Sequence, residues 1–249
     1  MVARTGILLL VGTLTFLTSI IINLPASLFF GQIDGVAQNL KGLQIGKISG
    51  TIWEGSLETQ YQEFPVASVS WNTALLPLIL GRLNLELSLD ASGLKGKSDL
   101  SVSGDAVKLN NLDLEINSSF INTTTRPYGL KLSESFTVTA PEIYVSNNWL
   151  NKMNGRLLWP GGVIEIETPL ERLRTQLPML QGIAKMENKE VKLYMYSKSE
   201  EIIILSLNQL GWAKAEINHL FFEIAKIPFP SSGAVNQKDP AITMEEKIL

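Results

Sequence analysis

The longest run of apolar residues lies near the N-terminus. No residue from Thr5 to Ile33 carries a charge, and residues 6–30 are mostly Leu, Ile, Val, Phe and Thr. About 20 such residues, each rising about 1.5 Å along a helix, cross the hydrocarbon core of a bilayer. The run therefore predicts one transmembrane helix over residues 6–30.

After this run, apolar and polar residues alternate. Between Leu83 and Ala91 leucine occupies every second position, which is the period of a half-buried β-strand. Short strands with tight connections pair as antiparallel neighbours, and one apolar face per strand implies a sheet wrapped over a single core. We therefore expect a mainly β fold, an antiparallel, curved sheet with one or two short helices. The alternation recurs in residues 100–102, 109–116, 136–145, 163–167, 191–196 and 202–207.

Turn-forming residues separate these runs. Gly and Asn tolerate the backbone conformations that tight turns need. We expect turns at Ser92-Gly93, Gly96, Gly104, Asn110-Asn111, Asn154-Gly155, Gly161-Gly162 and Asn188.

Two segments predict short helices. Thr168 and Glu171 have the spacing of a capping box, with Pro169 at the first helical position, so we expect a helix over residues 169–177. Pro178 is expected to end or kink it. A second helix is expected from Pro25 to about Leu40, continuing or following the transmembrane run.

The charges that flank the apolar run indicate its orientation. The N-terminal amine and Arg4 precede the run, whereas Asp34 and then Lys41 follow it, so the N-terminus is expected in the cytoplasm and the rest across the membrane. A cleaved signal peptide is the alternative, but the candidate site at Leu24-Pro25-Ala26 begins with a large residue. Under either interpretation most of the chain is exported across the membrane. In a bacterium this places it in the periplasm.

The last residues differ from the strand-like segments. From Pro228 the chain reads Pro-Phe-Pro-Ser-Ser-Gly and becomes polar, which predicts a loose tail. The expected organisation is therefore a cytoplasmic N-terminus (1–5), a transmembrane anchor (6–30), a periplasmic β-rich domain (31–227) and a disordered tail (228–249).

Composition excludes several classes of function. The net charge of −3 does not provide the basic surface that nucleic acid requires. The absence of Cys and the single His219 exclude disulfides, thiolate metal sites, Cys nucleophiles and His-based metal clusters. With 45% hydrophobic and 18% charged residues, the chain suits a membrane-associated protein. We expect a protein that is not an enzyme and holds no cofactor or metal.

Two weak catalytic candidates remain. Glu165 and Glu167 are two apart on a predicted strand and face the same way, as a glycosidase pair would, but alternating Ile and Glu is typical of a solvated sheet face. His219 lacks a recognisable nucleophile or orienting acid nearby in the sequence, so it is expected to be a structural or surface residue.

Glycine and tryptophan gather near the apolar run. Gly50 and Gly55 permit tight turns on both sides of a short strand that contains Thr51 and Trp53. Trp53 and Trp71 offer large apolar surfaces, each with an N–H that needs a partner. We expect both indoles to pack or cap at the first corner of the sheet, in preference to binding a ligand.

The order of these features resembles the type II secretion system protein N family of Gram-negative bacteria. The resemblance rests on Leu24-Pro25-Ala26 at the end of the apolar run, Gly50 to Gly55, Trp71, Pro77, Leu80-Gly81-Arg82-Leu83, Gly155 to Trp159, and Val163 to Ile166. The family implies a bitopic inner-membrane protein with a periplasmic β-rich domain and no established catalytic residues. Its motif positions in this chain are Gly50, Thr51, Trp53, Gly55, Trp71, Pro77, Gly81 and Trp159.

The resemblance implies an accessory component of type II secretion, which binds and positions other inner-membrane and periplasmic subunits. A more distant resemblance to AsmA-like and TamB-like envelope proteins implies an alternative. In that alternative, the apolar face that contains Leu85, Leu87 and Leu89 lines an open groove that binds or conducts phospholipid acyl chains. What covers this face decides between a closed core and a lipid groove.

Overall fold

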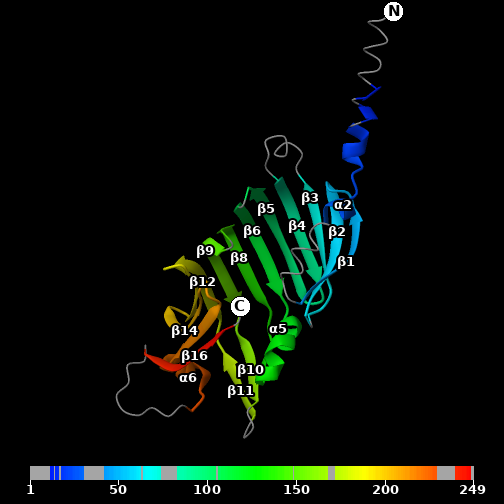
Figure 1. Cartoon of the computed structure of the whole chain (residues 1–249). Coiled ribbons are helices and arrows are strands. Elements are labelled where there is room, and N and C mark those ends of the chain that lie inside the picture. The colour runs from blue at the N-terminus through cyan, green and yellow to red at the C-terminus, as the bar shows by residue number, and fades with distance from the viewer. Residues whose placement is uncertain are drawn as a thin grey trace, which may run out of the picture.

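The computed structural model of the chain describes residues 12–13, 15–16, 18–30, 42–62, 64–73, 83–104, 106–147, 149–167, 172–228 and 239–247. Most of the described chain forms one 13-stranded sheet (Figure 1). The strands of this sheet are β1 (Leu43–Gly50), β2 (Glu54–Tyr61), β3 (Ala67–Thr73), β4 (Leu83–Ala91), β5 (Leu94–Ser103), β6 (Ala106–Ile116), β8 (Phe136–Ser146), β9 (Trp149–Trp159), β12 (Leu180–Glu187), β13 (Glu190–Ser197), β14 (Glu200–Leu207), β15 (Trp212–Asn218) and β16 (Pro240–Lys247).

A smaller sheet and several short helical segments complete the described fold. The smaller sheet has the order β11-β10-β7. Asn117 caps the first helix after β6 by accepting a hydrogen bond from the N–H of Ser119 at 3.0 Å. The elements are β7 (Leu130–Leu132), β10 (Gly162–Glu167), β11 (Arg172–Leu177), α2 (Ala26–Phe30), α5 (Ser118–Thr125), α6 (His219–Ala225) and the 3-10 helix η1 (Arg126–Tyr128).

The large sheet follows the order of the sequence. Every neighbouring pair is antiparallel, and the order departs from strand numbering only where β7, β10 and β11 leave to form the smaller sheet. Tight connections between alternating segments produce this arrangement, because consecutive antiparallel strands need only a short turn. The predicted mainly β, antiparallel fold is confirmed.

The register aligns the apolar residues of successive strands. Leu85 pairs with Leu100, Leu100 with Leu109, and Leu109 with Ile143, and directly paired residues lie on the same face. The sheet therefore has an apolar face, on which these residues lie, and an opposite polar face. In β4 the apolar face is only half-buried at Leu85 and Leu87.

The fully buried core lies in the C-terminal half of the sheet. There the apolar face packs against β10, β11 and α6, and Thr175 of β11 donates a hydrogen bond to the carbonyl of Ala225 in α6 at 2.5 Å. The buried members of this core are Trp159, Ile164, Leu177, Leu180, Met195, Ile202 and Ala225.

The prediction of a helix over residues 169–177 is wrong for residues 172–177, the part that the structure describes. Residues 172–177 form β11, whose Leu173 pairs with Ile166 and whose Leu177 pairs with Gly162. Leu173, Thr175 and Leu177 also alternate with polar residues, and pairing with β10 selects this period over the local capping signal. Residues 168–171, which include that signal, lie outside the described residues.

Part of the expected loose tail is ordered in a strand. Residues 240–247 form β16, which pairs with β15 in the antiparallel direction. Lys247 is opposite Trp212 at one end, and Pro240 is opposite Asn218 at the other. The composition of this segment is polar, but the unpaired edge of β15 supplies backbone partners that composition does not reveal. Residues 229–238 and 248–249 lie outside the described residues.

Several expected turns are confirmed and others are wrong. Gly104 and Asn188 lie in turns, as do Ser92-Gly93, and Gly161 lies in the connection between β9 and β10. Gly96 lies inside β5, and Asn154-Gly155 inside β9. Asn110-Asn111 form an irregularity within β6, where Asn111 has a φ of 52° and the register with β5 shifts, so the extra residue makes a bulge.

The N-terminal part is described in fragments. Residues 1–11, 14 and 17 of the chain lie outside the described residues, so most of the first half of the predicted 6–30 span does too. Among the described residues, no helix has the length and apolar character that crossing a membrane requires. Ala26–Phe30 is helical within the helix expected from Pro25 to about Leu40, and residues 31–41 lie outside the described part.

Candidate functional site: the hairpin that binds the N-terminal segment

The Gly50–Gly55 segment is a hairpin turn that joins β1 to β2. Gly50 and Gly55 are the last paired residues, and the N–H of Thr51 donates to the carbonyl of Glu54 at 2.8 Å. Gly50 has a φ of 90°, and a Cβ there would lie 2.6 Å from the Cα of Gly55. The prediction of a short strand between the two glycines is wrong, because Gly50 and Gly55 pair with each other and the residues between them form the turn.

Trp71 of β3 packs against this turn. Gly55 pairs with Trp71, and a Cβ on Gly55 would lie 2.9 Å from Cε2 of the indole. The indole is buried, with 6% of its surface exposed, and its Nε1 donates to the carbonyl of Thr51 at 3.3 Å. Glycine at position 55 therefore leaves the space that the ring fills.

The hairpin turn binds the end of the N-terminal segment. Residues 18–22 are helical, and the Nε1 of Trp53 donates to the carbonyl of Ile21 at 2.9 Å. The N–H of Ile52 donates to the carbonyl of Leu24 at 3.1 Å, and Pro25 forms a bridge with Thr51. The carbonyl of Ile21 also accepts a hydrogen bond from the N–H of Leu24 at 3.3 Å, at the end of the helical turn, so Trp53 supplies a second donor from the sheet. In Figure 1 the described N-terminal residues meet the sheet beside β1 and β2.

Thr73 fixes the hairpin turn from the other side. Its Oγ1 donates to the carbonyl of Ile52 at 2.8 Å, and its N–H donates to the carbonyl of Trp53 at 2.6 Å. Thr73 is 6% exposed. Sequence reasoning missed it, although a polar residue that continues the alternation of Val69 and Trp71 is a signal of a buried hydrogen bond.

The structure brings five of the eight motif residues to this corner. Trp159 lies elsewhere, in the C-terminal core, where its ring stacks with Phe136 at 6.0 Å between centroids. Its buried Nε1 has no hydrogen-bond partner among the described residues. Pro77 and Gly81 lie outside the described residues. The five at the corner are Gly50, Thr51, Trp53, Gly55 and Trp71.

The two glutamates of β10 form ion pairs. Glu167 binds Arg172 of β11 at 2.5 Å, and Glu165 lies 3.7 Å from Nε of Arg174. The hydrogen bond from Arg172 lowers the pKa of Glu167. A carboxyl group whose pKa is lowered is a poor general acid, and both glutamates lie beside arginines of the neighbouring strand, so the arrangement supports a solvated sheet face. His219 begins α6 and is half-buried.

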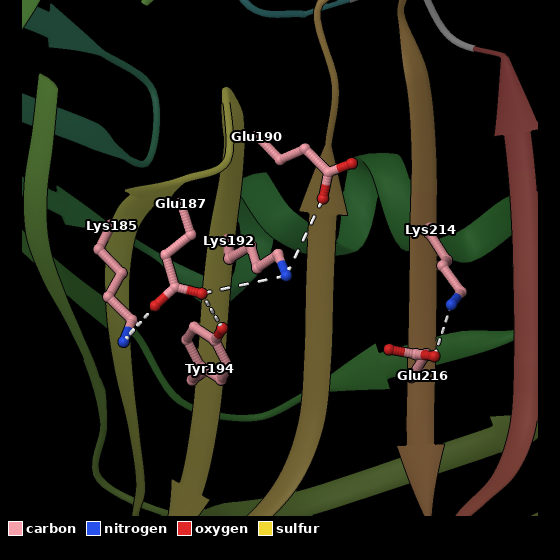
Figure 2. Close-up of polar contacts among 7 residues, drawn as sticks. All are labelled: Lys185, Glu187, Glu190, Lys192, Tyr194, Lys214 and Glu216. Carbon is pink, nitrogen blue, oxygen red and sulfur yellow. Dashed lines mark hydrogen bonds and ion pairs between the residues drawn. The ribbon is translucent and has the colours of Figure 1, made fainter. Parts of the chain in front are cut away.

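Ion pairs cover the polar face at the C-terminal end of the sheet (Figure 2). Lys185 binds Glu187 at 2.6 Å, and Lys214 binds Glu216 at 2.6 Å. Tyr194 donates a hydrogen bond to Glu187 at 2.5 Å. This hydrogen bond and burial raise the pKa of Tyr194 to about 12. These side chains therefore bind one another on the polar face.

The apolar face has an open groove at the same end. Its volume is about 630 Å³, and it extends from β13 to β16. Leu205 pairs with Ala215, which pairs with Met244, so the small Ala215 leaves a hollow between larger neighbours. The apolar residues that line the groove are Val191, Leu193, Leu205, Leu207, Ala213, Ala215 and Met244.

Comparison with known families identifies the family of the chain. A family model of the type II secretion system (T2SS), protein N, matches residues 41–219. The chain belongs to this protein N family. No curated protein and no solved structure matches it. The match to protein N begins just before β1, includes every described strand through β15, and stops at the first residue of α6. The 50–55 hairpin turn thus belongs to the family domain, whereas its partners at Ile21 and Leu24 and the strand β16 lie beyond the matched residues.

Proposed function

We propose that this member of the protein N family is an inner-membrane accessory subunit of type II secretion that binds and positions other subunits. Residues 6–30 form its anchor, the N-terminus lies in the cytoplasm, and the β-rich domain of residues 31–227 lies in the periplasm. Family membership supports the secretion role. The uncharged run from Thr5 to Ile33 supports the anchor.

The contact between the 50–55 hairpin turn and the N-terminal segment carries this proposal. Hydrogen bonds from Trp53 to Ile21 and from Ile52 to Leu24 join the sheet to the end of the apolar run. Phe16 and Ile22 are 65% and 56% exposed, which suits side chains that contact lipid. An anchor bound in this way holds the domain close to the membrane at a fixed orientation.

The proposal is tested by deleting the gene in its own host and measuring release of secreted proteins. We expect release to fall, full-length protein to restore it, and the tagged chain to co-purify with secretion subunits from detergent-solubilised membranes. Unchanged release together with the absence of these subunits from the purified material would contradict it. Protease added to the periplasmic side should cleave a site inserted after Lys247 but not one inserted after Met1.

The half-buried apolar face supports a second function, binding of phospholipid acyl chains. Leu85 and Leu87 of β4 are only half-buried, whereas the residues of the C-terminal core are buried. A long apolar face that stays partly accessible suits an acyl chain. Native mass spectrometry of the detergent-purified chain should then detect bound phospholipid, and Leu87→Glu should reduce it. The matched control is Leu210→Glu, at an exposed turn residue. Phospholipid that is absent, or equally abundant in both variants, would contradict this function.

A further inference from the structure

The strand β16 forms one edge of the large sheet. It pairs with β15 on one side, and no described residue pairs with its other side. Its register with β15 is unbroken from the pair of Trp212 and Lys247 to the pair of Ile217 and Ile242. At the opposite edge, β1 has a register shift between Ile45 and Ile48, and such a bulge hinders pairing. β16 is therefore the more regular of the two edges.

An apolar hollow borders this edge. Ile242, Met244 and Glu246 lie on the apolar face, because they pair with Ile217, Ala215 and Ala213. Met244 lines the 630 Å³ groove and is 54% exposed. A strand added beside β16 would place every second side chain on this face, next to Met244 and the groove.

The edge also carries unpaired negative charge. Among the described residues, Asp239, Glu245 and Glu246 form no ion pair within 4.0 Å. Lys214 is cross-strand from Glu245 but already binds Glu216 at 2.6 Å. Lys247 supplies the only cation of β16 itself. Charge complementarity therefore favours a basic partner.

We propose that the outer edge of β16, which no described residue pairs with, binds an extended segment of another protein as an added strand. The segment has large apolar residues at alternate positions and Lys or Arg opposite Glu245 and Glu246. Main-chain hydrogen bonds to β16 give affinity, and the groove and carboxylates give specificity. This inference rests on the proposed function, which makes the partner a neighbouring secretion subunit.

The test measures binding of defined peptides to the full chain in nonionic detergent micelles by fluorescence anisotropy, with empty micelles as the blank. The probe is a nine-residue peptide of alternating Leu and Thr that ends in two consecutive Lys residues, and a matched peptide has Glu in place of both Lys residues. We expect the Lys peptide to bind with a Kd below about 1 mM, about tenfold tighter than the Glu peptide. Two further Lys peptides have N-methyl groups on alternate amides, and we expect only one of them to lose binding, since only one set of N–H groups faces β16.

Variants test the charge and the place of binding. Glu245→Lys combined with Glu246→Lys should reverse the preference to the Glu peptide, whereas the control Glu86→Lys, at an exposed site of β4, should not. The proposal is overturned by equal binding of both N-methylated peptides, or by a preference for the Lys peptide that persists in the variant with Lys at positions 245 and 246. If the peptides bind as expected but gene deletion leaves secretion unchanged, the proposed function fails and the strand-addition site stands.

Discussion

One N–H group of Trp53 joins the N-terminal segment to the sheet. Trp53→Phe keeps the ring but removes the donor to Ile21, and a hydrogen bond of this kind contributes about 0.5–1.5 kcal/mol. We expect proteolysis and hydrogen exchange near residues 21–26 to increase while the sheet stays folded. Trp149→Phe is the matched control, because its indole donates to Lys189 at another corner. Equal effects of the two changes near residues 21–26 would contradict this prediction.

Thr73 permits a sharper test of the hairpin turn. Thr73→Val preserves shape but leaves the carbonyl of Ile52 without its side-chain donor in a buried place. We expect the free energy of unfolding to fall by about 1–3 kcal/mol, the usual cost of an unsatisfied buried group, as measured by urea denaturation. Thr59→Val removes an exposed hydrogen bond to Gln44 and should cost less. A larger loss at Thr59 would show that the turn does not depend on Thr73.

At the scale of elements, Glu187 of β12 and Tyr194 of β13 couple stability to alkaline pH. The pKa of Tyr194 is raised to about 12 from 10.0, first by the hydrogen bond to Glu187. The folded chain keeps a proton that the unfolded chain loses above pH 10, so the free energy of unfolding falls between pH 10 and about 12. Glu187→Gln should shift the ionisation of Tyr194 downward, measured by ultraviolet absorbance against Tyr194→Phe. Glu190→Gln should leave it in place, and an equal shift would contradict the assignment.

Local pattern predicted the strands whose alternation is strong, as in Leu83–Ala91, because one face of each is apolar. It failed for β11 and β16, whose residues alternate weakly and become strands by pairing with β10 and β15. At the corner, the sequence identified Trp53 and Trp71 but not Thr73. The hydroxyl of Thr73 donates to a carbonyl 21 residues away in the sequence. The two groups meet only because their segments are close in three dimensions, so residue spacing does not predict this hydrogen bond.

Across the whole molecule, the core is distributed unevenly. Leu177 is 1% exposed within the C-terminal core, whereas Leu87 of β4 is half-buried. Leu177→Ala should therefore cost about 2–5 kcal/mol of unfolding free energy, and Leu87→Ala about 1 kcal/mol, because truncation costs depend on burial and cavity formation. Urea denaturation of both variants measures this difference. Equal losses would show that the apolar face of β4 belongs to a closed core.

The sequential order of the large sheet also determines how it can be assembled. Each of its strands after β1 pairs with a strand that precedes it in the chain, and short separations between paired segments favour rapid folding. A chain that is delivered N-terminus first can thus extend the sheet one strand at a time, with a template always in place. The smaller sheet differs in the separation of its paired strands, because β8 and β9 lie between β7 and β10 in the chain. The C-terminal core also needs Ala225 of α6, so it is completed late.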